Sequence, residues 1–131
     1  MTKLCPCHSQ QPYTQCCQPY HQDKRRPTTP TNLMRSRYAA YALGLTSYIL
    51  KTEKPPNPTQ PLPTRRAAIR QFAQTTSFVG LQILDASPIE DNHATVTFRA
   101  ILLQKGRDAS YTETSLFQRT NNRWFYIKPQ P

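Results

Sequence analysis

Four cysteines lie within the first seventeen residues, and the rest of the chain contains no other cysteine. Thiolate sulfur is a preferred ligand of Zn²⁺, which binds four donors at tetrahedral angles with Zn–S distances of about 2.3 Å. A site closed by four protein sulfurs leaves no coordination position for water or substrate, so it stabilises a fold and does not catalyse. Cys5, Cys7, Cys16 and Cys17 therefore predict one structural Zn²⁺ that orders a segment too short to fold by burial alone.

The backbone around these cysteines must aim four sulfur atoms at one point. A Cys-x-Cys pair can do this from a tight turn, whereas the adjacent Cys16 and Cys17 can do it only from a nearly helical backbone. We therefore expect a helical turn at residues 13–15. Two alternatives stay open for the cluster, namely a pair of disulfides, and another metal or redox switching. His8 or His21 can also replace one sulfur ligand, although we expect both to be surface histidines.

The chain carries 17 Lys and Arg against seven Asp and Glu, a formal net charge of +10. Such an excess favours acidic partners, which include an acidic protein, the ribosome surface and nucleic acid. Nucleic acid is the least favoured of these, because the basic residues are scattered and form no platform with aromatic residues. The N-terminus lacks the apolar stretch of a signal peptide, and no apolar run reaches membrane-spanning length. We therefore expect a cytoplasmic protein without a membrane span, whose thiols are reduced.

The composition divides the chain into three parts. The cysteine motif occupies residues 1–23, a basic linker stiffened by prolines occupies residues 24–30, and one larger domain occupies residues 31–131. In that domain, apolar residues first recur at intervals of three and four, which predicts helices, with Gly44 ending the first of them. The expected helices cover residues 32–43, 46–51 and 65–75, with Thr64 capping the last one, and a proline-rich loop covers residues 55–63.

In the C-terminal half, apolar residues recur at every second position, which is typical of half-buried strands. Val79, Leu81 and Ile83 are expected to share one face of the first strand. Turns at residues 90–92 and 121–122 return the chain, so neighbouring strands are antiparallel. Helices followed by a run of antiparallel strands predict an α+β fold.

Several segments resemble known bacterial families. Cys5-Pro6-Cys7-His8-Ser9, followed at eight residues' spacing by Cys16-Cys17, is similar to the SEC-C motif, a zinc-binding motif that also ends the motor ATPase of bacterial protein export. The segments that resemble the bacterial YchJ family are Leu33-Met34-Arg35-Ser36-Arg37-Tyr38-Ala39-Ala40-Tyr41, Glu113-Thr114-Ser115-Leu116-Phe117 and Trp124-Phe125-Tyr126. This resemblance covers nearly the whole chain. It implies that the four cysteines are the ligands, that the location is the bacterial cytoplasm, and that the larger domain is a cone like nuclear transport factor 2, in which a curved antiparallel sheet wraps helices.

The chain departs from the pattern of this family at four places. His8 stands where members carry glycine in the knuckle turn. Glu53-Lys54-Pro55 replaces a Trp-His-Pro segment, and Lys128-Pro129 replaces Asp-Gly after the last aromatic strand. The chain also stops at Pro131, where many members continue into a second cysteine motif. The second and third departures remove a histidine and an acid, which weakens an enzymatic interpretation, and the family itself implies no settled activity.

A polar cluster is expected where the helices meet the sheet. Glu113, Ser115 and Phe117 alternate along one strand, and because Phe117 should be buried, Glu113 and Ser115 should also face the helices. Arg35 or Arg37, on the first long helix, can then pair with Glu113. Buried charges must be paired and hydrogen-bonded. We favour a structural ion pair over a pocket, because no histidine, cysteine or second acid accompanies this group.

Four further residues are interpreted as structural. Ser36 is expected on the helix surface and not as a nucleophile, and His93 is expected to be solvated beside a turn. Trp124 and Tyr126, which alternation places on one face of a strand, are expected in the core and not on a base-stacking surface.

Together these observations predict a non-enzymatic, zinc-binding interaction protein. Its cysteine motif, with Lys3, Lys24, Arg25 and Arg26 nearby, is expected to dock on an acidic protein or a ribosomal surface. The alternative hypothesis is a cone that binds a small molecule, or an uncharacterised enzyme, in which the polar cluster forms the pocket and the zinc knuckle is accessory. A solvent-open apolar cavity above about 300 Å³ lined by that cluster would favour the alternative, since ligand sites have roughly this size or more.

Overall fold

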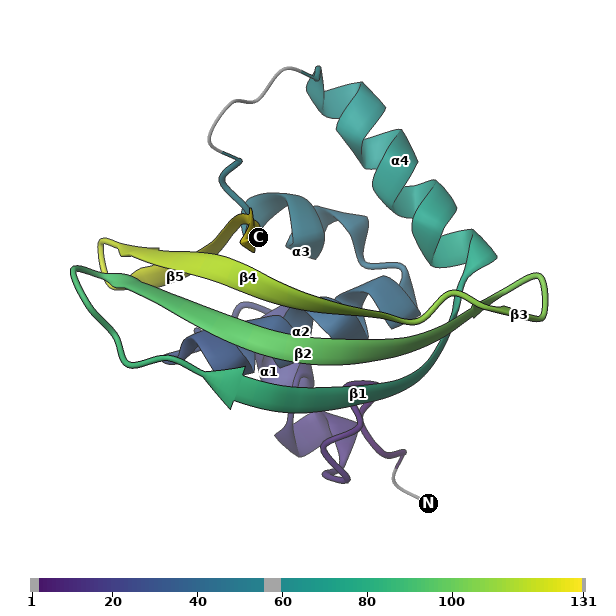
Figure 1. Ribbon diagram of the computed structural model, residues 1–131, viewed down its shortest axis with the longest axis horizontal. Helices are drawn as coiled ribbons and strands as arrows, with labels where there is room; N and C mark the ends of the chain where they lie inside the picture. Colours follow the sequence, from purple (N-terminus) through teal and green to yellow (C-terminus); the bar gives the residue numbers. More distant parts are fainter. Residues whose placement is uncertain (1–2, 56–59, 131) are drawn as a thin grey trace.

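The computed structural model describes residues 3–55 and 60–130, and in it the helices precede the strands (Figure 1). The helical elements are the 3₁₀ turn η1 (Tyr13–Gln15), α1 (Gln18–His21), α2 (Pro30–Leu43), α3 (Thr46–Lys51) and α4 (Leu62–Thr75). The strands are β1 (Ser77–Ala86), β2 (His93–Gln104), β3 (Arg107–Asp108), β4 (Tyr111–Thr120) and β5 (Arg123–Gln130). This order confirms the predicted α+β class.

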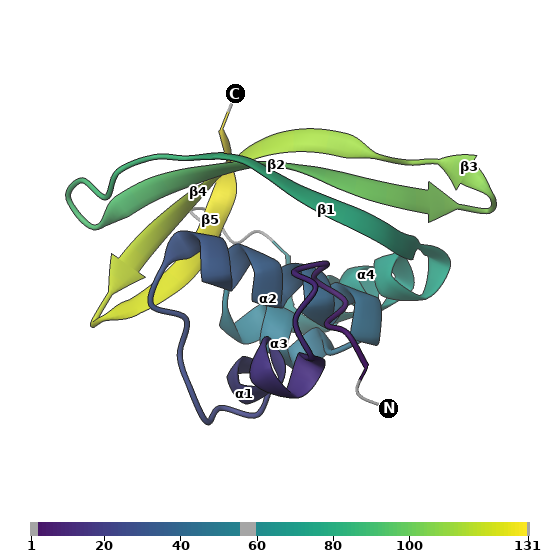
Figure 2. The ribbon, with the colours of Figure 1, turned by 90° about the horizontal axis from the view of Figure 1, so that it is seen from below.

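The strands form one antiparallel sheet in the order β1-β2-β4-β5, and the short β3 pairs with the end of β2. Long strands twist and curve, so the sheet has a concave face that can enclose helices. All the helices lie on that one face, with α2 nearest to the sheet and α1 on the far side of α2 (Figure 2). The sheet and helices thus form the predicted cone, and α2 is covered on two sides.

Helix α2 has well-defined ends. Thr29 caps its N-terminus by accepting a hydrogen bond from the backbone N–H of Asn32 at 3.1 Å, and Pro30 occupies the first turn, where its missing N–H does no harm. Gly44 ends the helix with φ of 73°, in the left-handed region that glycine adopts without strain. The predicted end at Gly44 is confirmed.

Helix α4 begins earlier than predicted. We expected Thr64 to cap a helix over residues 65–75, but the helix starts at Leu62, and its N-cap is Pro61, which makes no side-chain cap hydrogen bond. Proline is compatible with the first turn of a helix, so Pro63 continues the helix and does not delay it. The prediction of a proline-rich loop at residues 55–63 is therefore wrong from Leu62 onward, and residues 56–59 of that loop lie outside the described residues.

The first strand also differs from the simple alternation. Its pairing with β2 shifts register between Phe78 and Gly80, which is a β-bulge at Val79. A bulge reverses the side of the sheet to which the following residues point. Phe78, Leu81 and Ile83 therefore pack on the core, whereas Val79 is 49% exposed, and the prediction that it shares a face with Leu81 and Ile83 is wrong.

The main core lies between α2 and the concave face of the sheet. Its buried residues are Leu33, Met34, Tyr38, Leu81, Ala94, Val96, Phe98, Ala100, Leu102, Phe117 and Trp124, and Tyr126 packs against them. The core positions predicted for Trp124 and Tyr126 are thus confirmed. The Trp124 indole Nε1–H donates to the carbonyl of Thr28 at 3.3 Å, which fixes the basic segment at residues 24–30 against the sheet. Among the described residues, no helix has both the length and the apolar character needed to cross a bilayer.

Candidate metal centre and pocket

The four cysteine sulfurs lie within 4.8 Å of one another. The Sγ atoms of Cys7 and Cys16 are 3.6 Å apart, and those of Cys16 and Cys17 are 3.9 Å apart. A tetrahedral site with Zn–S distances of about 2.3 Å has sulfur–sulfur edges of about 3.8 Å, whereas a disulfide bond measures about 2.05 Å. All four cysteines are free. The separations therefore fit four ligands around one metal ion and do not fit paired disulfides.

A small hairpin presents the first two cysteines. The backbone N–H of Cys5 donates to the carbonyl of Gln11 at 2.8 Å, and Leu4 forms an isolated bridge with Pro12. The turn between them passes through His8, which has φ of 63°. The left-handed region favours glycine, so a histidine with this φ is strained at this point of the turn. The His8 ring partly offsets this by donating from Nε2 to the carbonyl of Phe78 at 3.3 Å.

The second cysteine pair follows a helical turn, as predicted. Helical turn η1 immediately precedes Cys16, and Cys17 has helical dihedral angles of −89° and −18°. Cys16 does not, with φ of −118° and ψ of −96°, because η1 ends at this residue before α1 begins. The nearly helical backbone is therefore confirmed for Cys17 and wrong for Cys16.

Neither histidine belongs to the sulfur cluster, which consists of the four cysteines. The prediction of surface histidines is wrong for His8, which is half-buried, and for the equally half-buried His21. Its Nε2–H donates to the carbonyl of Ser36 at 2.9 Å, and its Nδ1 accepts from the Tyr13 hydroxyl at 2.7 Å. Burial lowers the pKa of His21, which favours the neutral ring that this pair of hydrogen bonds requires. His21 thus connects the cysteine segment to α2.

The cysteine segment packs directly on α2. Cys5, Cys7 and Cys17 form a buried cluster with Ala39, whose side chain is fully inaccessible. Arg35 donates to the backbone carbonyl of Cys7 at 3.2 Å. A small side chain at Ala39 lets the cysteine backbone approach the helix closely. The segment is therefore held against the larger domain by burial and hydrogen bonds, and not only by the chain at residues 24–30.

The thiols influence one another strongly. Contacts with Cys5 and Cys7, followed by burial, raise the pKa of the Cys17 thiol, while contacts with Cys17 and Cys5 lower the pKa of Cys7. Four sulfurs this close cannot all be anionic without a compensating charge. A divalent cation at their centre supplies that charge and favours all four thiolates. The donor set therefore fits a metal ion in chemistry as well as in spacing.

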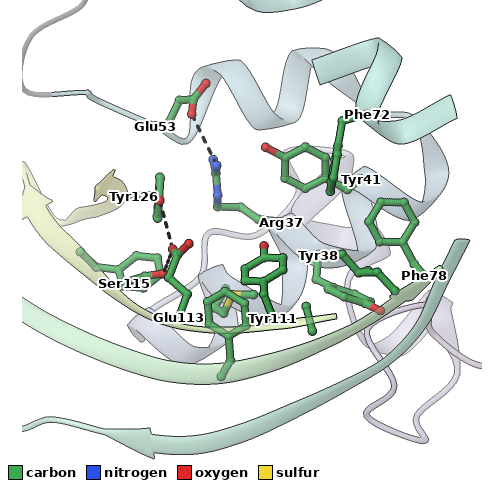
Figure 3. Close-up of a pocket in the computed structure, with 15 residues that line it drawn as sticks. Arg37, Tyr38, Tyr41, Glu53, Phe72, Phe78, Tyr111, Glu113, Ser115 and Tyr126 are labelled. Carbon is green, nitrogen blue, oxygen red and sulfur yellow. Dashed lines mark hydrogen bonds and ion pairs between the residues drawn. The ribbon is translucent and has the colours of Figure 1, made fainter. Parts of the chain in front are cut away.

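A second candidate site is a cavity of about 280 Å³ between α2, α4 and the concave face of the sheet (Figure 3). Of the predicted pocket residues, Arg37, Glu113 and Ser115 line it, and Arg35 does not. Figure 3 shows Glu113 and Ser115 rising from the sheet toward the polar end, with Tyr38, Tyr41, Phe72 and Phe78 at the aromatic end. The other lining residues are Met34, Glu53, Phe98, Ala100, Leu102, Tyr111, Phe117 and Tyr126.

The ion pair that we predicted between Glu113 and an arginine is wrong. Arg37 pairs instead with Glu53, at 3.5 Å. It also donates to the carbonyl of Ile49 at 3.0 Å and to Oγ1 of Thr52 at 2.7 Å. Glu53 lies just after α3, and no periodic pattern in the sequence pointed to it.

Glu113 is held by neutral hydroxyl groups. Its Oε2 accepts from the Ser115 hydroxyl at 2.6 Å and from the Tyr126 hydroxyl at 3.2 Å. Burial, and then the negative charge of Glu113, raise the pKa of Tyr111 to about 12 and also raise the pKa of Tyr126. These phenols therefore stay protonated and can donate. This role could not be predicted from the sequence, since tyrosine at helical or strand spacing is equally consistent with a filled core.

The prediction for Ser36 is wrong, and the prediction for His93 is confirmed. Ser36 has an exposed fraction of 0%, so the prediction of a helix-surface residue is wrong. Its hydroxyl donates to the carbonyl of Leu33 at 2.8 Å and hydrogen-bonds the Tyr48 hydroxyl at 2.7 Å. The reason is that α1 and α3 cover the side of α2 that faces away from the sheet. His93 is exposed, as predicted, and its Nδ1 donates to the carbonyl of Asp91 at 2.8 Å.

Two family models match this chain. The SEC-C motif matches residues 1–19, and the middle NTF2-like domain of YchJ matches residues 29–129. A UPF0225 protein of Actinobacillus succinogenes is 36% identical over 128 residues, which span 97% of this chain and 81% of that protein. A UPF0225 protein of Bordetella pertussis is 35% identical over 125 residues, which span 94% of this chain and 89% of that protein.

Solved structures share the arrangement of both parts. The solution structure of RPA3114, a SEC-C motif containing protein from Rhodopseudomonas palustris, has a TM-score of 0.82 and 30% identity, and the match covers 98% of both chains. The crystal structure of a SEC-C motif containing protein from Psychrobacter arcticus has a TM-score of 0.78 and 27% identity, with 98% of this chain and 82% of that one covered. With a sulfur cluster that matches the SEC-C motif and a cone that matches the YchJ domain, this chain belongs to the YchJ family of proteins.

Proposed function

We propose that this chain is a non-enzymatic protein that binds a small molecule in the cavity between α2 and the sheet. The observation that carries the proposal is the cavity itself, about 280 Å³ and lined mainly by aromatic rings with Arg37, Glu53, Glu113 and Ser115 at one end. Ligand sites combine such an apolar lining with a few converging polar groups. The volume lies just below the value of about 300 Å³ at which such sites begin, so it suits a small ligand.

Binding is favoured over catalysis by the state of the polar groups. Arg37 is engaged by three protein acceptors, so it is a poor candidate for a group that acts on a substrate. No histidine or cysteine is among the described residues that line the cavity. Ser115 and Glu113 do form a hydroxyl–carboxylate pair in the lining, but the lining has neither the cysteine nucleophile nor the histidine base of the common covalent mechanisms.

The cysteine cluster is proposed to hold one Zn²⁺, with Cys5, Cys7, Cys16 and Cys17 as its ligands. The support is the sulfur spacing and the tetrahedral preference of that ion. Bound zinc would supply folding free energy to the segment and no reaction chemistry. We also propose the division into a motif at residues 1–23, a linker at residues 24–30 and a domain at residues 31–131, in a protein of the bacterial cytoplasm, where thiols stay reduced.

The binding proposal is tested by a ligand-observed NMR screen of a chemically diverse fragment collection. Ala100 lines the cavity and is 2% exposed, so Ala100→Leu fills part of the space without placing a new group on the surface. We expect fragments that bind the zinc-loaded wild-type chain and lose binding to this variant. A matched control is Ala86→Leu, at an exposed residue at the end of β1. Fragments that bind all three proteins equally, or no fragments at all, would contradict the proposal.

A second candidate function is docking on an acidic protein or ribosomal surface. It is supported by Lys24, Arg25 and Arg26, which are all exposed. Arg25 and Arg26 share a shallow crevice with Lys51 and Arg123, which joins the basic segment to the sheet. Nucleic acid suits the same charge less well, since the sheet aromatics Trp124 and Tyr126 pack on the core. A pull-down from lysate over a salt titration tests this function, and partners retained at high salt would argue against an electrostatic contact.

A further inference from the structure

The Glu113 carboxylate presents one oxygen to the cavity that protein groups do not use. Both hydrogen bonds to this side chain, from Ser115 and Tyr126, end on Oε2. No described residue donates to Oε1. Every fully buried side-chain nitrogen or oxygen of the described residues does have a partner. Oε1 is therefore accessible, and a carboxylate oxygen accepts hydrogen bonds only.

The cavity contains no described basic group that is available to this oxygen. Arg37, the one basic side chain among the described lining residues, is 6% exposed and is engaged by Glu53, Ile49 and Thr52. Its guanidinium also lies over the Tyr126 ring, 4.8 Å from the centroid. The lining thus holds two carboxylates and one guanidinium, a net charge of −1 when all are ionised.

The negative charge of Glu113 raises the pKa of the tyrosine hydroxyls around it. After burial, the largest influence on the pKa of Tyr111 and of Tyr126 is the charge of Glu113, which raises both and exceeds the opposing influence of Arg37. At these two rings the negative charge of Glu113 therefore outweighs the positive charge of Arg37. A ligand that enters must either compensate this charge or strip water from an unpaired carboxylate, which is unfavourable.

The aromatic end provides a surface for an apolar body. Tyr41, Phe72 and Phe78 contact one another, with ring centroids 5.5 Å apart for Tyr41 and Phe72 and 5.8 Å apart for Phe72 and Phe78. Figure 3 shows these rings away from Glu113, with Tyr111 between the two ends. The electron-rich ring faces attract cations as well as apolar groups. A ligand with one apolar end and one cationic end matches both parts of the lining.

We propose that the ligand is a small organic amine, bound as its ammonium cation with an N–H directed at Oε1 of Glu113 and its apolar body against the aromatic end. This rests on the proposed function, since it names the ligand class of the same cavity. An anionic ligand would face an uncompensated carboxylate, and a neutral ligand would leave that charge desolvated and unpaired.

The test compares three probes of similar shape on the zinc-loaded full chain: 2-phenylethylamine, 2-phenylethanol and 3-phenylpropanoate. Affinities are measured from amide shift changes in NMR titrations at pH 7. We expect the amine to bind about ten-fold or more tightly than the alcohol, because the ammonium compensates the charge of Glu113, whereas the alcohol can donate to the carboxylate but leaves its charge uncompensated. The carboxylate should bind most weakly. Glu113→Gln should remove the preference for the amine, whereas Glu90→Gln, at an exposed loop residue, should keep it.

The outcomes separate this inference from the proposed function. Alcohol binding as tight as amine binding, or an amine preference that survives Glu113→Gln, would overturn the cationic ligand class and leave the cavity a ligand site. If none of the three probes binds but the fragment screen has given cavity ligands, the amine ligand class is overturned and the ligand site stands. If the fragment screen has also given none, both the ligand class and the ligand site are overturned. Should Glu113→Gln not fold, Glu113→Asp retains the charge on a shorter side chain, so the preference for the amine over the alcohol should persist in it, and its loss would count against the proposal.

Discussion

The Arg37–Glu53 pair offers a quantitative test of how the cavity is built. Glu53 forms an ion pair with Arg37 at 3.5 Å and accepts a hydrogen bond from Arg65 at 2.8 Å, and the Arg37 side chain is 7% exposed against 21% for Arg65. Arg37→Met keeps the apolar stem but removes the donors to Ile49 and Thr52. Removing one partner of a buried pair destabilises by about 3–5 kcal/mol. Because Glu53 keeps Arg65, we expect a loss of about 2–3 kcal/mol.

Arg65→Met is the matched control for this prediction. Its side chain is more exposed and Glu53 keeps Arg37, so the loss should be about 0–1 kcal/mol. The double variant leaves Glu53 without either arginine and should lose about 1 kcal/mol more than the two single losses together. Urea unfolding of the zinc-loaded proteins, followed by circular dichroism, measures all three. A loss below about 1 kcal/mol for Arg37→Met, or a larger loss for Arg65→Met, would refute the assignment of Arg37 as the buried support of the cavity.

Three further perturbations test other parts of the structure. Cys17→Ser should lower the zinc content of the purified protein well below that of the wild type by elemental analysis, and Ser9→Ala, beside the cluster, should not. Zinc removal by a chelator should speed amide hydrogen exchange in residues 3–21 far more than in β2 and β4, because the sheet has its own core; equal acceleration throughout would show that the metal supports the whole fold. His21→Phe removes the hydrogen bonds to Ser36 and Tyr13 and should lower the unfolding free energy by about 1–3 kcal/mol, whereas His93→Phe, at an exposed turn, should change it by less than about 0.5 kcal/mol. Similar losses in the two histidine variants would contradict the role given to His21.

Features that depend only on residues nearby in the sequence could be predicted from it. Four clustered cysteines restrict the metal to few kinds, and Gly44 marks a helix end because its backbone adopts φ of 73°. The alternation of Val96, Phe98 and Ala100 reflects a strand with one buried face, and all three are buried. In each case the signal lies within one element and needs no knowledge of what packs on it.

The errors occurred where a distant contact decides the outcome. Ser36 is polar and lies on a helix, but packing by α1 and α3 buries it. Val79 fits a perfect alternation, and only its pairing with β2 reveals the bulge. Arg37 could pair with either of two carboxylates. The sequence does not show that Glu53, after the end of α3, lies closer to Arg37 than Glu113 does. The cavity could not be predicted either, because whether aromatic rings touch or leave a space between them depends on how the helices pack on the sheet.

We propose that this protein carries one structural metal ion and one ligand in its cone. Native mass spectrometry of the chain purified from the organism that naturally makes it measures both at once, with Ala100→Leu purified in parallel. We expect a wild-type mass that exceeds the mass of the chain by one zinc ion and one small organic molecule, and a variant mass that retains the zinc and lacks the molecule. A folded wild-type chain with zinc and no organic adduct, or the same adduct on both proteins, would contradict it.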